Sequence, residues 1–212
     1  MSVTDRRAVV IRIFERYLVE VVERYDLCPW ARGAREGGEV AVEVVWGTPS
    51  LDAWVSAAEE LLARPATRVA MVIAPELVIT PSDLHAVRGN VALRIPTAGV
   101  AEFHPEARLD LSTPPKLVPF VRRSPDPLLQ LVPLALLDQV RGAPSAASLQ
   151  QQAQILGGVA APPKLDVAAR IARANHSMLT EMHGDFTRVL QAIREDRDTS
   201  YARVGISASL RP

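Results

Sequence analysis

The stretch EVAVEVVWGTPSLDAWVSAAEELLARPATRVAMVIAP, residues 39–75, determines the fold class. Its first part, residues 39–47, is rich in valine and ends in glycine, which is typical of a β-strand. Residues 50–65 place apolar side chains at helical spacing behind Ser50, a good N-cap. Residues 67–75 are a nearly continuous apolar run, which indicates a strand that is covered on both faces. A strand, a helix and a central strand therefore follow one another.

The segments around this stretch continue the same order. Residues 5–25 have a helical period, residues 81–95 are expected to form another helix, and residues 99–104 a third strand that ends at His104. Because a crossover through a helix returns the chain in the same direction, we expect an α/β fold. Its sheet should be small, mixed or largely parallel, with about three to four strands flanked by helices. The carboxyl ends of these strands would meet at one edge, where open sheets bind ligands.

The second half of the chain is richer in proline. Residues 112–119 are interpreted as a stiff linker, and residues 123–140 as a helix with Ser124 as its N-cap, which Pro133 should end or kink. Residues 163–197 have the pattern of a long C-terminal amphipathic helix, followed by a loose tail. We expect residues 1–212 to form a single domain.

Composition excludes several classes of partner. Lys and Arg together number 24, as do Asp and Glu, so no net charge attracts nucleic acid or an anionic membrane. Charges recur every few residues near the N-terminus, which argues against a signal peptide or a membrane span. The single cysteine, Cys28, excludes an internal disulfide and fits a reducing compartment. We therefore expect a cytoplasmic protein that has no nucleic-acid and no membrane partner.

A cluster of cationic and hydroxyl side chains precedes the helix expected at residues 123–140. The N-terminus of a helix carries free N–H groups and a partial positive charge. Arg122 and Arg123 would add guanidinium groups suited to a carboxylate or phosphate, so that Arg122, Arg123 and Ser124 are the candidate anion-binding residues. The alternative is that the arginines are surface or ion-pair residues and that Ser124 only caps the helix.

Two further residues are candidates for catalysis. His104 at the end of a strand is suited to proton transfer, and Glu102 should face the same side of the strand, where it could orient the imidazole. Alternatively, His104 only holds a loop. Cys28 would be a nucleophile if a nearby cation such as Arg32 lowered its pKa; otherwise it is a small buried apolar residue.

Metal and cofactor signatures are not found in the sequence. His176 and His183 are seven residues apart, about 10.5 Å along a helix, which is too far for both to hold one ion comfortably. The sequence has no glycine-rich phosphate loop, no zinc-protease motif and no nucleophile elbow. We expect no metal and no cofactor.

The motifs LCPWA (27–31), AEFHPEARL (101–109) and RRSPDPLLQLV (122–132), in this order, resemble the bacterial family known as domain of unknown function 1415. The resemblance covers about residues 8–140. It implies that the family's cysteine, histidine, arginine and serine correspond to Cys28, His104, Arg123 and Ser124. Two positions depart from the family pattern: Arg122 stands where asparagine is usual, and Gln130 where a histidine on the helix is usual. The resemblance implies no particular reaction.

Two functional hypotheses follow. The first is an enzyme acting on a small anionic metabolite, with Arg122 and Arg123 binding the anion, His104 transferring a proton and Cys28 nearby as nucleophile or pocket wall. The second is a noncatalytic ligand-binding or interaction protein that forms a homo-oligomer through its C-terminal helix. The sequence does not decide between them.

Overall fold

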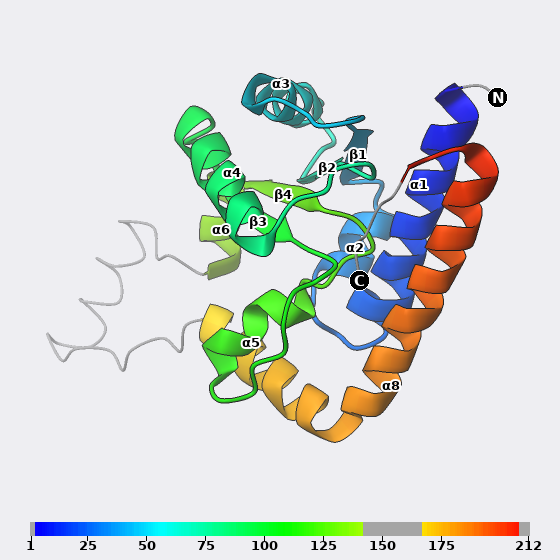
Figure 1. The fold of residues 1–212 in the computed structure, drawn as a ribbon. Coiled ribbons are helices and arrows are strands. Elements are labelled where there is room, and N and C mark those ends of the chain that lie inside the picture. The colour runs from blue at the N-terminus through cyan, green and yellow to red at the C-terminus, as the bar shows by residue number, and fades with distance from the viewer. Residues whose placement is uncertain (1–2, 142–166, 208–212) are drawn as a thin grey trace, which may run out of the picture.

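The computed structural model describes residues 3–141 and 167–207. Three helical segments precede the first strand, a helix connects each strand to the next, and a short helix and a long helix follow the last strand (Figure 1). In chain order the elements are α1 (Val3–Tyr17), the π-helix η1 (Leu18–Glu23), α2 (Ala31–Glu36), β1 (Val40–Val44), α3 (Leu51–Leu62), β2 (Val69–Ile73), α4 (Pro81–Arg94), β3 (Ala98–Phe103), α5 (Pro114–Val121), β4 (Leu128–Pro133), α6 (Leu134–Arg141) and α8 (Val167–Val204).

The four strands form one mixed sheet in the order β1-β2-β4-β3. β1 and β2 pair in parallel, whereas β4 is antiparallel to both β2 and β3. β1, β2 and β3 therefore run in the same direction and end at the same edge of the sheet. The predicted α/β fold, with a small mixed sheet flanked by helices and a long C-terminal helix, is confirmed.

Helices cover both faces of the sheet. Side chains of β2 alternate between the two faces: Met71 and Ile73 join a core with α1, α5 and α8, while Ala70 and Val72 join a core with α3 and α4. Figure 1 shows α3 and α4 on one side of the sheet and α1 and α8 on the other. Burying each large apolar side chain stabilises the fold by about 1.5–3 kcal/mol, so β2 is held from both sides as its apolar run predicts.

The predicted helix over residues 123–140 is wrong. Leu128–Pro133 forms β4, and only Leu134–Arg141 is helical. Leu128 pairs with Ile73 on one side and Phe103 on the other, so β4 lies between two strands that both satisfy its backbone. A short apolar run fits such a position as well as it fits a helix. The predicted linker is also wrong, because Pro114–Val121 is the helix α5.

The C-terminal helix is longer than predicted. It continues to Val204, so residues 198–204 are helical rather than a tail, and Met182 (φ −114°, ψ 15°) marks a kink within it. The predicted start at residue 163 lies outside the described residues. Four apolar side chains of α8 are buried against α1, η1 and α5: Leu179, Phe186, Ile193 and Tyr201. Met182, at the kink, is 43% exposed. The chain itself therefore covers much of the face from which we predicted a subunit contact.

A buried ion pair attaches α8 to the loop before β4. Arg197, 1% exposed, donates from Nε to Asp126 Oδ1 at 2.7 Å and from Nη2 to the carbonyl of Pro75 at 3.3 Å. The hydroxyl of Tyr201 donates to Asp126 Oδ2 at 2.6 Å. Burial alone would lower the pKa of Arg197, but the charge of Asp126 raises it overall. Both carboxylate oxygens of Asp126 thus have a donor.

Candidate functional site

The residues that follow β1 and β2 contact one another and the helix α1. Glu76, which follows β2, accepts a hydrogen bond from the backbone N–H of Gly47 at 3.0 Å and forms an ion pair with Arg6 of α1. The Arg6 guanidinium also lies 4.5 Å from the centre of the Trp46 ring. α1 therefore fills this part of the edge, and β4 separates it from the end of β3.

A pocket of about 590 Å³ lies instead beside β3, which is an edge strand. We call it the histidine pocket. It is formed by the N-terminus of α4, the end of β3 with the turn after it, and the end of α5, and its polar lining residues are Thr80, Ser82, His85, Glu102, His104, Arg108 and Arg122. Glu102 and His104 both line it, as their spacing of two along a strand predicts.

The start of α4 is fixed by local sequence. Thr80 is the N-cap, and its hydroxyl oxygen accepts a hydrogen bond from the N–H of Asp83 at 3.1 Å, while Pro81 occupies the first turn. Leu84 is fully buried against the sheet. The next residue, His85, is rotated by about 100° around the helix axis, which places it on the exposed side where it lines the pocket.

His85 and Glu102 form a hydrogen-bonded pair in this pocket. His85 Nδ1 is 2.8 Å from Glu102 Oε1, and the nearby Arg88 Nε is 3.2 Å from the other carboxylate oxygen, Oε2. Burial alone would raise the pKa of Glu102, but the hydrogen bond with His85 and the charge of Arg88 lower it. When Nδ1–H donates a hydrogen bond to the carboxylate, Nε2 of a neutral imidazole is the basic atom.

Arg88 does not occupy the lone pair of His85 Nε2. Arg88 Nη2 is 3.3 Å from Nδ1 and 3.1 Å from Nε2. A donor in line with the lone pair of one ring nitrogen would be much farther from the other nitrogen. Because Arg88 Nη2 is almost equally distant from both, it lies against the face of the ring. The side chain of His85 is 61% exposed, so Nε2 is open to a ligand.

Two arginines line the histidine pocket without an acidic partner at ion-pair distance in the described part of the chain. Arg122 is partly buried with its guanidinium 5.7 Å from the centre of the Phe103 ring, and burial lowers its pKa while the charge of Glu102 opposes this. Arg108 is exposed at the pocket rim. No side-chain hydrogen bond joins either guanidinium to another described residue. Their donors therefore remain for an anion.

His104 has a different environment from the one predicted. Its side chain is 5% exposed. Nε2 lies 2.9 Å from the carbonyl of Ile79, and Nδ1 accepts a hydrogen bond from the N–H of Glu106 at 3.0 Å. Both ring nitrogens are thus bound to the backbone, which fixes a neutral imidazole with its proton on Nε2. Glu102, which we expected to orient His104, binds His85 instead.

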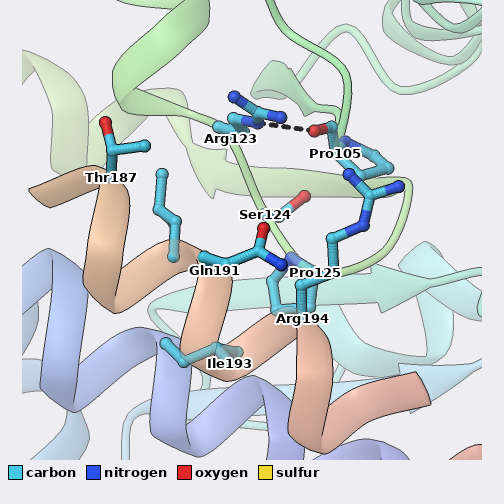
Figure 2. Close-up of a pocket in the computed structure, with 9 residues that line it drawn as sticks. Pro105, Arg123, Ser124, Pro125, Thr187, Gln191, Ile193 and Arg194 are labelled. Carbon is cyan, nitrogen blue, oxygen red and sulfur yellow. Dashed lines mark hydrogen bonds between the residues drawn. The ribbon is translucent and has the colours of Figure 1, made fainter. Parts of the chain in front are cut away.

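Arg122 and Arg123 lie in different pockets. Arg123 and Ser124 line a smaller pocket of about 60 Å³ between the segment after α5 and the helix α8 (Figure 2). We call it the arginine pocket; its other lining residues are Pro105, Pro125, Thr187, Leu190, Gln191, Ile193 and Arg194. Ser124 does not cap a helix, because its hydroxyl donates to the carbonyl of Asp126 at 2.5 Å. The predicted clamp of two adjacent arginines on a helix N-terminus is therefore wrong.

Cys28 lines neither pocket and lies in the turn between η1 and α2. Burial raises the pKa of its thiol, and hydrogen bonds from the backbone of Trp30 and Ala31 offset this only partly. The arginine that we considered as an activating group, Arg32, lies 3.5 Å from Glu23 instead. The environment of Cys28 thus favours the neutral thiol, as the apolar alternative predicts.

Sequence reasoning missed His85, the residue best placed for proton transfer. The only signal was its spacing of three from Arg88 on one helix face, together with a strand carboxylate at Glu102. Within residues 3–141 and 167–207, no group of three or more His, Cys, Asp or Glu side chains is arranged to hold a metal ion.

The fold and the histidine pocket together define a mixed α/β protein with a paired histidine and carboxylate beside an edge strand. Searches with protein-family models, among curated proteins and among solved structures found no match to this chain. The resemblance to domain of unknown function 1415 therefore stays a prediction. Gln130, where that family's pattern has a histidine on a helix, lies on β4. Among the described helices, none has both the length and the hydropathy needed to cross a membrane.

Proposed function

We propose that the chain is an enzyme that removes a proton from, or adds a proton to, a small anionic molecule bound in the histidine pocket. In this proposal Arg122 and Arg108 bind the anion, His85 is the acid or base, and Glu102 orients it. The observation that carries the proposal is the 2.8 Å contact between His85 Nδ1 and Glu102 Oε1 in a pocket with two arginines that lack acidic partners. The anionic substrate and the role of Arg122 are the same as in the sequence-based hypothesis. The role of acid or base, which that hypothesis gave to His104, is now given to His85.

The chemistry follows from the charges around the two atoms that would react. Nε2 of neutral His85 accepts a proton from the ligand, and Glu102 stabilises the imidazolium that forms. The electron pair left on the ligand increases its negative charge next to Arg122, whose partly buried guanidinium interacts with anions more strongly than one in bulk water. A pocket of about 590 Å³ suits a metabolite-sized molecule.

The balanced charge of the chain supports a small molecule rather than a polyanion as the ligand. We also propose a cytoplasmic location, because many intracellular metabolites are carboxylates or phosphates.

Binding and proton transfer can be tested without a known reaction. Small carboxylates and phosphate esters are first screened for binding by the shift they cause in the thermal unfolding midpoint. Each compound that binds is then incubated with the protein in D₂O, and exchange of its C–H protons is followed by proton NMR. We expect His85→Gln to abolish exchange with little change in Kd, and Arg122→Gln to weaken binding by about tenfold or more.

His176→Gln is the matched control for His85→Gln, because His176 lies on α8, lines neither pocket, and has its ring Nε2 2.9 Å from the carbonyl of Leu111. Arg203→Gln is the control for Arg122→Gln, because Arg203 is exposed on α8 and lines neither pocket. Binding without any exchange would support the noncatalytic alternative. Exchange that persists in His85→Gln would refute the role given to His85.

A further inference from the structure

The arginine pocket brings together two cations from segments far apart in the sequence. Arg123 follows α5 and Arg194 lies on α8, and Figure 2 shows both side chains extending toward Pro105. No acidic side chain lies within ion-pair distance of either guanidinium in the described part of the chain; Glu106 acts on Arg123 only through its charge. Two like charges that converge without a counter-ion repel each other, and an anion between them would remove that repulsion.

The surrounding structure fixes the side chain of Arg123 and the helix that carries Arg194. Arg123 donates from Nε to the carbonyl of Pro105 at 2.7 Å, which leaves its two Nη groups for a ligand. Arg194 stands between Ile193 and Arg197 on α8, and these two side chains are each 1% exposed. The buried pair of Arg197 with Asp126 therefore fixes the helix that carries Arg194. A site whose donors are already oriented loses less entropy when an anion binds.

The size of the pocket restricts the ligand. Its volume of about 60 Å³ is several times the roughly 10–15 Å³ that one water needs, but it is far below the size of a metabolite pocket. It suits a single tetrahedral group. The hydroxyl of Thr187 and the amide of Gln191 also line the pocket.

We propose that the arginine pocket binds one phosphate group, either as free inorganic phosphate or as the phosphoryl group of a phosphomonoester. This site is separate from the histidine pocket and goes beyond the proposed function, since it uses none of the same residues. A bound phosphate would link the segment after α5 to α8.

The test is an NMR titration of the full ¹⁵N-labelled chain, first with inorganic phosphate and then with glycerol 3-phosphate. We expect saturable shifts of the amide signals of residues 187–194, including the side-chain amide of Gln191. Arg123→Gln and Arg194→Gln should each weaken this Kd by at least about tenfold, the loss expected for one charge-assisted hydrogen bond. The ligand with the lower Kd identifies the source of the phosphate group.

Two controls separate this site from its alternatives. Arg203→Gln removes an exposed arginine from the same helix and should leave the shifts unchanged. Arg122→Gln should also leave them unchanged. The result for this site therefore does not depend on whether the proposal for the histidine pocket is correct. Arg194→Gln keeps the bond between Arg123 and Pro105, so it remains informative if Arg123→Gln does not fold. Shifts that do not saturate, or that persist equally in both Gln variants, would overturn the proposal.

Discussion

Replacing Arg197 by methionine should destabilise the protein strongly. Methionine fills similar space but leaves Asp126 buried at 3% exposure with only the hydroxyl of Tyr201 as a side-chain donor. Breaking a buried ion pair by removing one partner costs about 3–5 kcal/mol. With an m value of about 2–3 kcal/mol/M in urea, the unfolding midpoint should fall by about 1–2.5 M.

The effect of pH separates the lost charge pair from lost packing. Burial already raises the pKa of Asp126 in the parent, where the charge of Arg197 opposes the shift; without that cation the folded-state pKa in the variant lies still farther above the unfolded value of about 3.9. Such a group favours the folded state most below its unfolded pKa, and this contribution is lost as pH rises through the folded pKa. The deficit of Arg197→Met relative to the parent should therefore grow between about pH 4 and pH 7.

Urea unfolding followed by circular dichroism at several pH values measures both effects. Arg203→Met, an exposed substitution on the same helix, should change the unfolding free energy by no more than about 0.5 kcal/mol. The double variant Asp126→Leu/Arg197→Met should be less destabilised than the two single changes together predict. A midpoint close to that of the parent protein, or a deficit that does not change with pH, would refute this account of the pair.

The pKa values of two other groups are shifted in opposite directions, upward for the thiol of Cys28 and downward for the carboxylate of Asp196. Because burial raises the pKa of Cys28, its alkylation by iodoacetamide, followed by mass spectrometry, should be slow at pH 7 and accelerate above about pH 8.5; a rate already at its plateau at pH 7 would contradict this. The hydrogen bond from Arg12, with a further one from Arg16, holds the pKa of Asp196 well below its usual range. Its stabilisation is therefore present above about pH 3.9 and is lost as pH falls below it. Asp196→Asn should cost at most about 1 kcal/mol at neutral pH, and thermal unfolding between pH 2 and 7 should show the difference shrinking in acid.

The first half of the fold was predictable because its signals are local. Ser50 was expected to cap a helix, and its hydroxyl oxygen does accept a hydrogen bond from the N–H of Ala53 at 3.2 Å. The helix–strand alternation up to β3 was also correct. β4 was missed because Leu128–Pro133 is a short apolar run after good capping residues, and its pairing with two distant strands leaves no local trace.

The site was predictable only in part, for the same reason. His104 and Arg122 line one pocket. The adjacent Arg123 contributes to another pocket, because the backbone after α5 is not the start of a helix. His85 becomes a candidate only when Glu102 lies next to it, and that contact spans 17 residues between α4 and β3. Periodicity cannot report such a contact.

The packing of α1 against α8 has a consequence for biosynthesis. Apolar side chains from the two ends of the chain, such as Phe14 and Phe186, share one core cluster. At about 5–20 residues per second, a ribosome needs roughly 10–40 s after α1 to complete α8. During that time the apolar face of α1 lacks its cover, and Asp126 has no cation. The nascent chain should therefore depend on chaperones until late in translation, and native structure should appear only once residues 179–206 have left the exit tunnel.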